Sequence, residues 1–143
     1  IGILAVTVLP RFFESSGYEE YTYRAQAISI LRNIQLRSMQ QSLDAADNPN
    51  LCVLINSKNL GIPDTGTCAA SPGFSIGFGQ GDFKRAAELA IETGHEVTFG
   101  AMKFSFTKLG RPLGCASPCI ITITGLENAN IIIESEGYIH AQD

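Results

Sequence analysis

The chain has 143 residues, of which 45% are hydrophobic and 17% charged, and its formal net charge is -4. A chain of this length corresponds to one domain that buries about two-thirds of its unfolded surface, so its core needs no metal or cofactor. Such an apolar composition excludes a disordered chain. The sequence pI near 5.1 argues against a basic nucleic-acid-binding protein, which needs an excess of Lys and Arg.

The N-terminus is an apolar run from Ile1 to Leu9, followed by Pro10, Arg11 and two phenylalanines. Such a run spans about 14 Å as a helix, or half of a bilayer core, so by itself it predicts no transmembrane segment. It also lacks the basic start and the cleavage site of a secretory signal. Because no capping residue precedes Ile1, we expect the run to be the end of a longer apolar segment, with an ordinary buried core segment as the alternative.

Residues 19–45 predict one long helix. Apolar side chains recur at three- and four-residue spacing, and no Gly or Pro occurs between Tyr18 and Ala46. Acidic Glu19 and Glu20 suit the positive end of the helix dipole, and Asp47-Asn48-Pro49 ends the helix. The expected apolar stripe contains Tyr23, Ala27, Ile30, Leu31, Ile34 and Met39, while the remaining faces carry Arg24, Arg32, Gln35 and Arg37.

After Pro49 the sequence changes to short β-branched and aromatic runs separated by Gly, Pro and Asn, which is typical of strands. Apolar and polar residues alternate over 102–107, so that strand has one buried and one wet face. The expected strands are Leu51–Asn56, Phe74–Phe78, Glu96–Phe99, Met102–Thr107, Ile120–Thr124, Ile131–Glu134 and Tyr138–Ala141, and Phe83–Ile91 is compatible with a short helix. A long N-terminal helix followed by strands predicts an α+β fold, with the helix packed against antiparallel β-sheet.

The four cysteines fall into two local pairs, Cys52 with Cys68 and Cys115 with Cys119. Four cysteines allow three connectivities, and proximity along the chain favours these two pairs. The spacings do not match zinc-binding knuckles, and neither histidine lies near a cysteine in the sequence. We expect disulfides and therefore a protein outside the cytoplasm, with buried free thiols or a metal site as the alternatives.

Two parts of the sequence resemble a known family. The string Gly2-Ile3-Leu4-Ala5, then Val6 to Pro10 and Arg11-Phe12-Phe13, resembles the end of the hydrophobic N-terminal helix of type IV pilins and pseudopilins, which carry a proline where Pro10 stands. Residues 104–112 resemble the strand and turn of GspH/FimT-type minor subunits, and 131–139 resemble the final hairpin of that group. Together these segments are similar to a minor pilin of the mannose-sensitive haemagglutinin (MSHA) pilus.

This resemblance implies a pilin-like fold in which 1–17 are a remnant of the hydrophobic helix and 18–143 form one globular domain. That domain has a helix at 19–45 and a β-rich part at 51–143. The processing site of the family and the glutamate inside its helix would precede Ile1, so neither is assigned to a residue of this chain.

The implied partners are other pilin subunits and the inner-membrane assembly platform. The implied location is an inner-membrane pool with a periplasmic domain and then the extracellular pilus, and the full-length form would contact the membrane through its N-terminal helix. In that role an apolar helix moves from the membrane into contact with equivalent helices of a filament. The candidate packing residues are Ile1, Ile3, Leu4, Val6, Val8, Leu9, Pro10, Phe12 and Phe13.

Three assignments have alternatives. Pro10 removes one backbone hydrogen bond and should kink the helix, or it stands at the first position of a helix that follows a loop. Phe12 and Phe13 also suit a globular core. The disulfide-bounded loop between Cys115 and Cys119 either shapes an interaction surface, as the resemblance suggests, or its disulfide only stabilises the sheet.

The sequence gives no pattern for catalysis, because no Ser or Cys lies in a nucleophile elbow and the two histidines are expected in a turn (His95) and a strand (His140). No cofactor or metal is expected. The glycine-rich stretch 71–82 does not match a phosphate-binding loop, and Asp44–Asn50 lacks the glycine and terminal glutamate of a calcium-binding EF-hand and predicts a helix-ending turn.

The resemblance therefore implies a structural protein, a minor pilin or pseudopilin that acts in filament initiation, in assembly or at the tip. A pseudopilin of a type II secretion system is one alternative. An adhesive or DNA-capturing minor pilin is another, with Lys103, Lys108 and Arg111 near an expected exposed turn. The sequence indicates no receptor.

Overall fold

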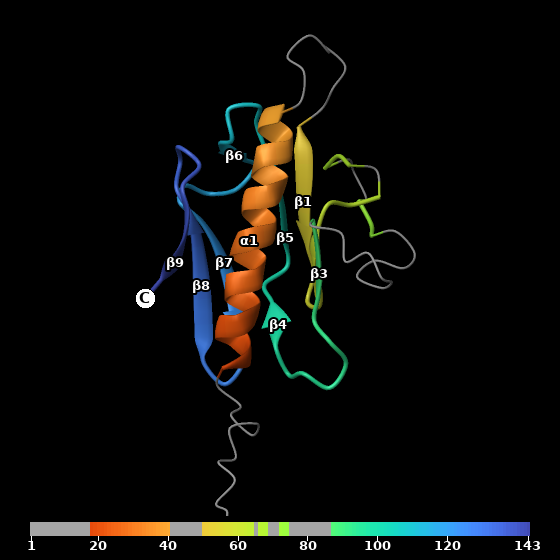
Figure 1. Ribbon diagram of the computed structural model, residues 1–143, viewed down its shortest axis with the longest axis vertical. Coiled ribbons are helices and arrows are strands. Elements are labelled where there is room, and N and C mark those ends of the chain that lie inside the picture. Colours follow the sequence, from red (N-terminus) through yellow and green to blue (C-terminus); the bar gives the residue numbers. More distant parts are fainter. Residues whose placement is uncertain (1–17, 41–49, 65, 69–71, 75–86) are drawn as a thin grey trace, which may run out of the picture.

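The computed structural model describes residues 18–40, 50–64, 66–68, 72–74 and 87–143 (Figure 1). The expected helix remnant at 1–17, the expected end of the long helix beyond Gln40 and most of the expected strand Phe74–Phe78 lie outside these residues. Most of the segment Asp44–Asn50 also lies outside them.

In the described residues, one helix is followed by a series of short strands. The helix is α1 (Glu19–Gln40), and the strands are β1 (Leu51–Ile55), β2 (Asn59–Gly61), β3 (Glu88–Ala90), β4 (Thr98–Phe99), β5 (Met102–Phe106), β6 (Pro112–Leu113), β7 (Cys119–Thr124), β8 (Asn128–Ile133) and β9 (Ile139–Gln142).

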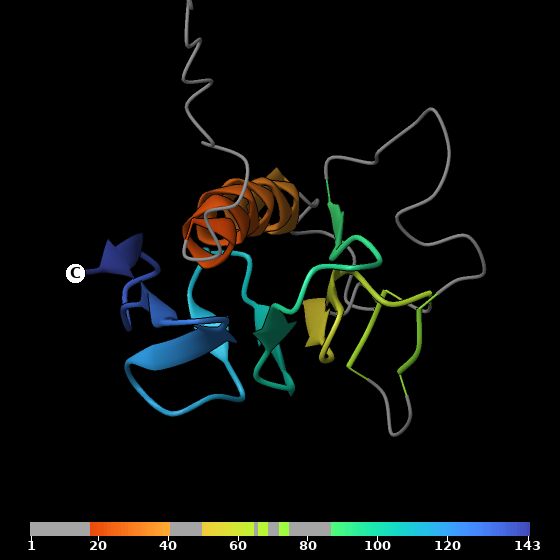
Figure 2. The same cartoon turned by 90° about the horizontal axis from the view of Figure 1, so that it is seen from below.

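The strands form two antiparallel sheets that share the helix. Sheet A has the order β3-β2-β1-β5-β6 and sheet B the order β4-β7-β8-β9. Helix α1 contacts strands of both sheets and lies on one side of them (Figure 2). The predicted α+β fold, a helix packed against antiparallel sheet, is therefore confirmed.

The buried face of α1 is a stripe at three- and four-residue spacing. Its middle consists of Tyr23, Ala27, Leu31 and Ile34. Polar residues extend the stripe at both ends, since Glu20 is 1% and Ser38 0% exposed. The prediction that Met39 belongs to this stripe is wrong, because Ser38 takes the buried position and leaves the neighbouring Met39 side chain 49% exposed.

Alternation along the strands supplies the other half of the core. In β5 the Phe104 and Phe106 side chains are buried, and Lys103 between Met102 and Phe104 is exposed. In sheet B the register pairs Ile121 with Ile131, and both are fully buried. Burying one side chain of this kind contributes about 1.5–3 kcal/mol, so the two sheets and α1 are held together mainly by this common core.

Several expected elements differ in the structure. Residues 88–90 of the expected helix Phe83–Ile91 form strand β3, because they pair with β2, which the sequence did not predict. Strand β6 was also not predicted. Such short segments have no clear period of their own and take their conformation from tertiary pairing. At the other strands the expected bounds are shifted by one to three residues, as for β8, which begins at Asn128 rather than Ile131.

Candidate subunit-interaction surface

The nine candidate packing residues, from Ile1 to Phe13, lie outside the described residues. The described part of the chain begins at Tyr18, directly before α1. The candidate packing residues therefore precede the start of this helix in the sequence. The Tyr18 carbonyl accepts hydrogen bonds from the Thr22 backbone N–H at 3.0 Å and from Thr22 Oγ1 at 2.9 Å. Glu19 and Glu20 occupy the first turn, where a carboxylate interacts favourably with the helix dipole.

The start of α1 is fastened to the turn between β7 and β8. The buried Glu20 carboxylate accepts a hydrogen bond from the Glu127 backbone N–H at 3.2 Å. Tyr21 donates its hydroxyl hydrogen to Glu127 Oε2 at 2.8 Å, and this hydrogen bond raises the pKa of Tyr21 above its ordinary value of 10.0. Gly125 leaves room for the carboxylate, because a Cβ atom there would lie 2.5 Å from Glu20 Oε2. These contacts therefore couple the position of this end of the helix to that of the β7–β8 turn.

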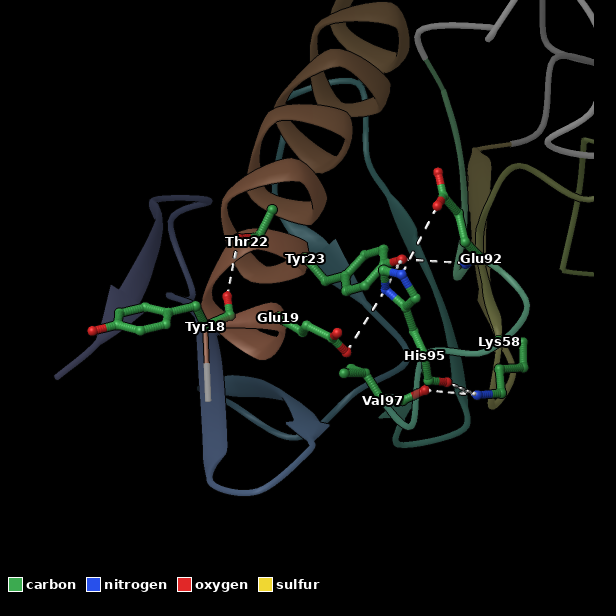
Figure 3. A network of polar contacts seen from close by, with 8 residues as sticks. All are labelled: Tyr18, Glu19, Thr22, Tyr23, Lys58, Glu92, His95 and Val97. Atoms are coloured by element: carbon green, nitrogen blue, oxygen red, sulfur yellow. Dashed lines mark hydrogen bonds and ion pairs between the residues drawn. The ribbon is translucent and has the colours of Figure 1, made fainter. Parts of the chain in front are cut away.

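A second polar network fixes the loop that precedes β4 (Figure 3). The Tyr23 hydroxyl oxygen accepts the Glu92 backbone N–H at 3.2 Å and lies 3.0 Å from His95 Nδ1. The carboxylates of Glu19 and Glu92 lie 3.7 Å and 3.9 Å from the two ring nitrogens of His95. As Figure 3 shows, these side chains bring α1 and the 92–97 loop together.

Lys58 holds the same loop from its other side. Its ammonium group donates to the backbone carbonyls of His95 at 3.0 Å and Val97 at 2.9 Å. Figure 3 shows His95 lying between Tyr23 and Lys58. The loop is therefore fixed both to α1 and to the residues that connect β1 with β2.

At the opposite end of α1 one amide group joins both sheets. Gln35 Nε2 donates to the Gly110 carbonyl in the β5–β6 turn and to the Gly137 carbonyl in the β8–β9 turn, each at 2.7 Å. One turn further along, Ser38 Oγ donates to the Phe106 carbonyl at 2.7 Å. The two turns are so close that no Cβ atom fits at Gly137, whose φ is also +104°.

Both expected cysteine pairs are disulfides in the structure. Cys52 of β1 is bonded to Cys68, and Cys115 is bonded to Cys119 at the start of β7. Neither pair leaves a thiol for metal binding or nucleophilic chemistry. In the part of the chain that the structure describes, no group of three or more His, Cys, Asp or Glu side chains is arranged to hold a metal ion.

Exposed large apolar side chains occur near both ends of α1. Tyr18 and Leu126, at the start of the helix and in the β7–β8 turn, are 70% and 69% exposed. At the far end, Leu109 and Tyr138 next to the two turns joined by Gln35 are 70% and 60% exposed, with Met39 nearby. Within the described ranges no helix has the length and apolar character needed to cross a bilayer.

Comparison with solved structures finds one protein in two crystal forms. The first is the crystal structure of the type IV minor pilin FimU of Pseudomonas aeruginosa, with a TM-score of 0.58 and 12% sequence identity, over 87% of this chain and 89% of that chain. The second crystal form gives a TM-score of 0.51 and 16% identity, over 86% of this chain and 92% of that chain.

The chain has a pilin-like fold. At this level of identity the likeness concerns the fold alone, and no protein-family model or curated protein sequence matches the chain. The pilin-like fold makes α1 the central element, and the side-chain contacts above show how this chain fastens its two sheets to that element.

Sequence reasoning missed Glu20, Gln35 and Ser38 as contacts between α1 and the sheets. A signal was present for two of them, since Glu20 and Ser38 continue the three- and four-residue spacing of the buried stripe at its ends. A polar residue on such a stripe indicates a partner in the backbone of the facing sheet. For Gln35 there was no such signal, because its partners are backbone carbonyls of two distant turns.

Proposed function

We propose that the chain is a minor subunit of a type IV pilus, of the MSHA type, and that it acts in filament initiation or assembly or at the filament tip. The observation that carries this proposal is the pilin-like fold over most of the chain, joined at the start of α1 to the apolar string 1–13. The two observations are independent, since the described fold does not include that string.

The role is mechanical. The apolar segment packs against equivalent segments of other pilin subunits, and the same side chains face lipid before assembly, so the transfer exposes little apolar surface to water. The globular domain then lies in the periplasm and later on the extracellular filament. Its side-chain contacts at both ends of α1 keep the two sheets in place when load passes along the helix.

Deleting the gene in its host tests this function. We expect fewer surface pili, measured as major subunit in the sheared fraction, while the cellular amount of the major subunit stays unchanged. Expression of the complete protein restores the pili. Normal piliation in the deletion strain would contradict the proposal.

The same strain separates the second candidate, a pseudopilin of a type II secretion system. In that case the amount of secreted enzyme in the culture medium would decrease in the deletion strain, and the pili would remain. For an adhesive or DNA-capturing subunit, the deletion strain would make a normal number of filaments and would lose attachment or DNA capture. A DNA-capturing subunit would also retard duplex DNA at low salt. The formal charge of -4 favours assembly over DNA capture.

A further inference from the structure

Strand β9 stands at the edge of sheet B, and its outward-facing backbone groups decide whether this edge is open. The Glu134 N–H donates to the Tyr138 carbonyl, and His140 is paired with Ile132. Because alternate residues of a strand point their backbone groups in opposite directions, the carbonyls of Ile139 and Ala141 face away from β8. A free row of such groups is a template to which a further strand can add.

Both of these outward carbonyls are occupied by side chains. Arg32 of α1 donates from Nη2 to the Ile139 carbonyl at 2.9 Å. His140 Nδ1 lies 3.0 Å from the Ala141 carbonyl. Both outward carbonyls are therefore engaged, one by a residue of the helix and one by a residue of β9 itself.

The surroundings of His140 determine its protonation state. Its other ring nitrogen, Nε2, lies 2.9 Å from Glu134 Oε1. A carbonyl and a carboxylate both accept hydrogen bonds, and a neutral imidazole has one N–H, so only the imidazolium form satisfies both contacts. The Tyr138 ring stacks on the imidazole with centroids 4.9 Å apart and an interplanar angle of 19°, which also suits a cation.

We propose that His140 is a proton-operated lock on β9: as an imidazolium it holds the Ala141 carbonyl and Glu134 together, and loss of the proton releases one of them and loosens the edge of sheet B. The lock joins the last strand to the end of β8 through side chains. The side chain of His140 is 28% exposed, so solvent protons reach it.

Other charged groups around this strand come from α1, from Asp143 and from the β8–β9 turn, where Glu136 accepts a hydrogen bond from Ser135. Arg32 donates to the Ile139 carbonyl and Arg24 to the Gln142 carbonyl, while Asp143 lies 3.5 Å from Arg24. Glu134 is the carboxylate in hydrogen-bond contact with the ring.

The direction of the pH effect follows from these contacts. The hydrogen bond to Glu134, followed by that to the Ala141 carbonyl, raises the pKa of His140 above its ordinary value of 6.5, and desolvation opposes them. A histidine with a higher pKa in the folded chain stabilises the fold fully below the unfolded pKa, and this contribution is lost as the pH rises through the folded pKa. His140 therefore holds the Ala141 carbonyl and Glu134 together in mildly acidic conditions. This contact loosens as the pH rises through the pKa of His140 in the folded chain.

Nitrogen-15 NMR of the histidine rings in the complete chain tests the lock. The chain has two histidines, and His140→Ala identifies the His140 signal by its loss. We expect His140 to remain doubly protonated to a higher pH than the histidines of the urea-unfolded chain, and Glu134→Gln to lower its titration midpoint. Glu136→Gln is the matched control, because the Glu136 carboxylate lies in the same turn and accepts a hydrogen bond from Ser135 instead. It should leave the His140 midpoint unchanged.

Amide exchange shows whether the lock acts on the strand. After correction for intrinsic rates, exchange of the Glu134 amide should accelerate several-fold as the wild-type chain passes the His140 midpoint, and His140→Ala should exchange at the faster rate at every pH. A His140 midpoint equal to that of the unfolded chain would overturn the proposal. So would a wild-type exchange rate that does not change across the midpoint.

Discussion

The amide group of Gln35 connects three parts of the molecule, since it lies on α1 and donates to Gly110 and Gly137 in turns of different sheets. We expect Gln35→Ala to lower the free energy of unfolding by about 1–3 kcal/mol, because two carbonyls lose their donor. Urea unfolding followed by circular dichroism measures this change. The control is Gln26→Ala, an exposed glutamine of the same helix, which should shift stability by no more than about 0.5 kcal/mol. Equal effects of the two substitutions would contradict this role of Gln35.

At the other end of the helix, the absence of a side chain at Gly125 leaves room for the Glu20 carboxylate. Gly125→Ala puts a methyl group 2.5 Å from Glu20 Oε2, so we expect a loss of about 1–3 kcal/mol in the free energy of unfolding. Gly100→Ala is the matched control in a neighbouring turn, because the nearest atom to its Cβ is the Thr122 carbonyl oxygen at 3.6 Å. The same unfolding measurement compares the two variants, and a Gly125 variant as stable as the Gly100 variant would show that the carboxylate has room to move.

At the scale of elements, the two disulfides stabilise the sheets unequally. Removing the Cys52–Cys68 bond, which closes a separation of 16 residues, should cost about 3 kcal/mol in the chain-entropy description, and removing the Cys115–Cys119 bond, with a separation of 4, about 2 kcal/mol. Each pair is replaced by two alanines, and thermal unfolding without reductant is compared. The Cys52 pair should show the larger fall in Tm. The reverse order would mean that local packing, rather than loop size, decides the effect.

The long elements were predictable from sequence because their own pattern specifies them. The stripe through Tyr23, Ala27 and Leu31 and the alternation around Phe104 hold in the structure. β3 was not predictable, because residues 88–90 are a strand only through pairing with β2. The division into two sheets has the same origin, since no local signal says that β5 pairs with β1, from which it is separated in sequence by β2, β3 and β4.

At the scale of the whole molecule, the proposed function requires that the apolar string before the described residues packs between subunits. Val8→Asp places a charge in that string, at a cost of about 2.5–3.5 kcal/mol at the centre of a membrane helix. We expect the amount of this chain in sheared filaments to fall at least about tenfold, as measured by immunoblot. Val8→Leu is the control and should enter filaments normally. If the Asp variant enters filaments as well as the Leu variant, the string does not pack between subunits.

The described domain explains why such a defect would be specific. Its core, its disulfides and the contacts of Glu20 and Gln35 all lie within residues 18–143. A charge in the string should therefore leave the circular dichroism and the disulfide content of the domain unchanged. Loss of filament entry together with an intact domain would assign the effect to assembly rather than to folding.

The most direct test of the central claim is to look for this chain in the filament itself. Surface pili are sheared from cells that express the complete protein, purified and analysed by quantitative mass spectrometry. The proposed function predicts peptides of this chain in the purified filaments at a small fraction of the major subunit, and their loss in the gene deletion. Filaments that contain none of this chain, from cells in which it is present in the envelope, would contradict its role as a pilus subunit.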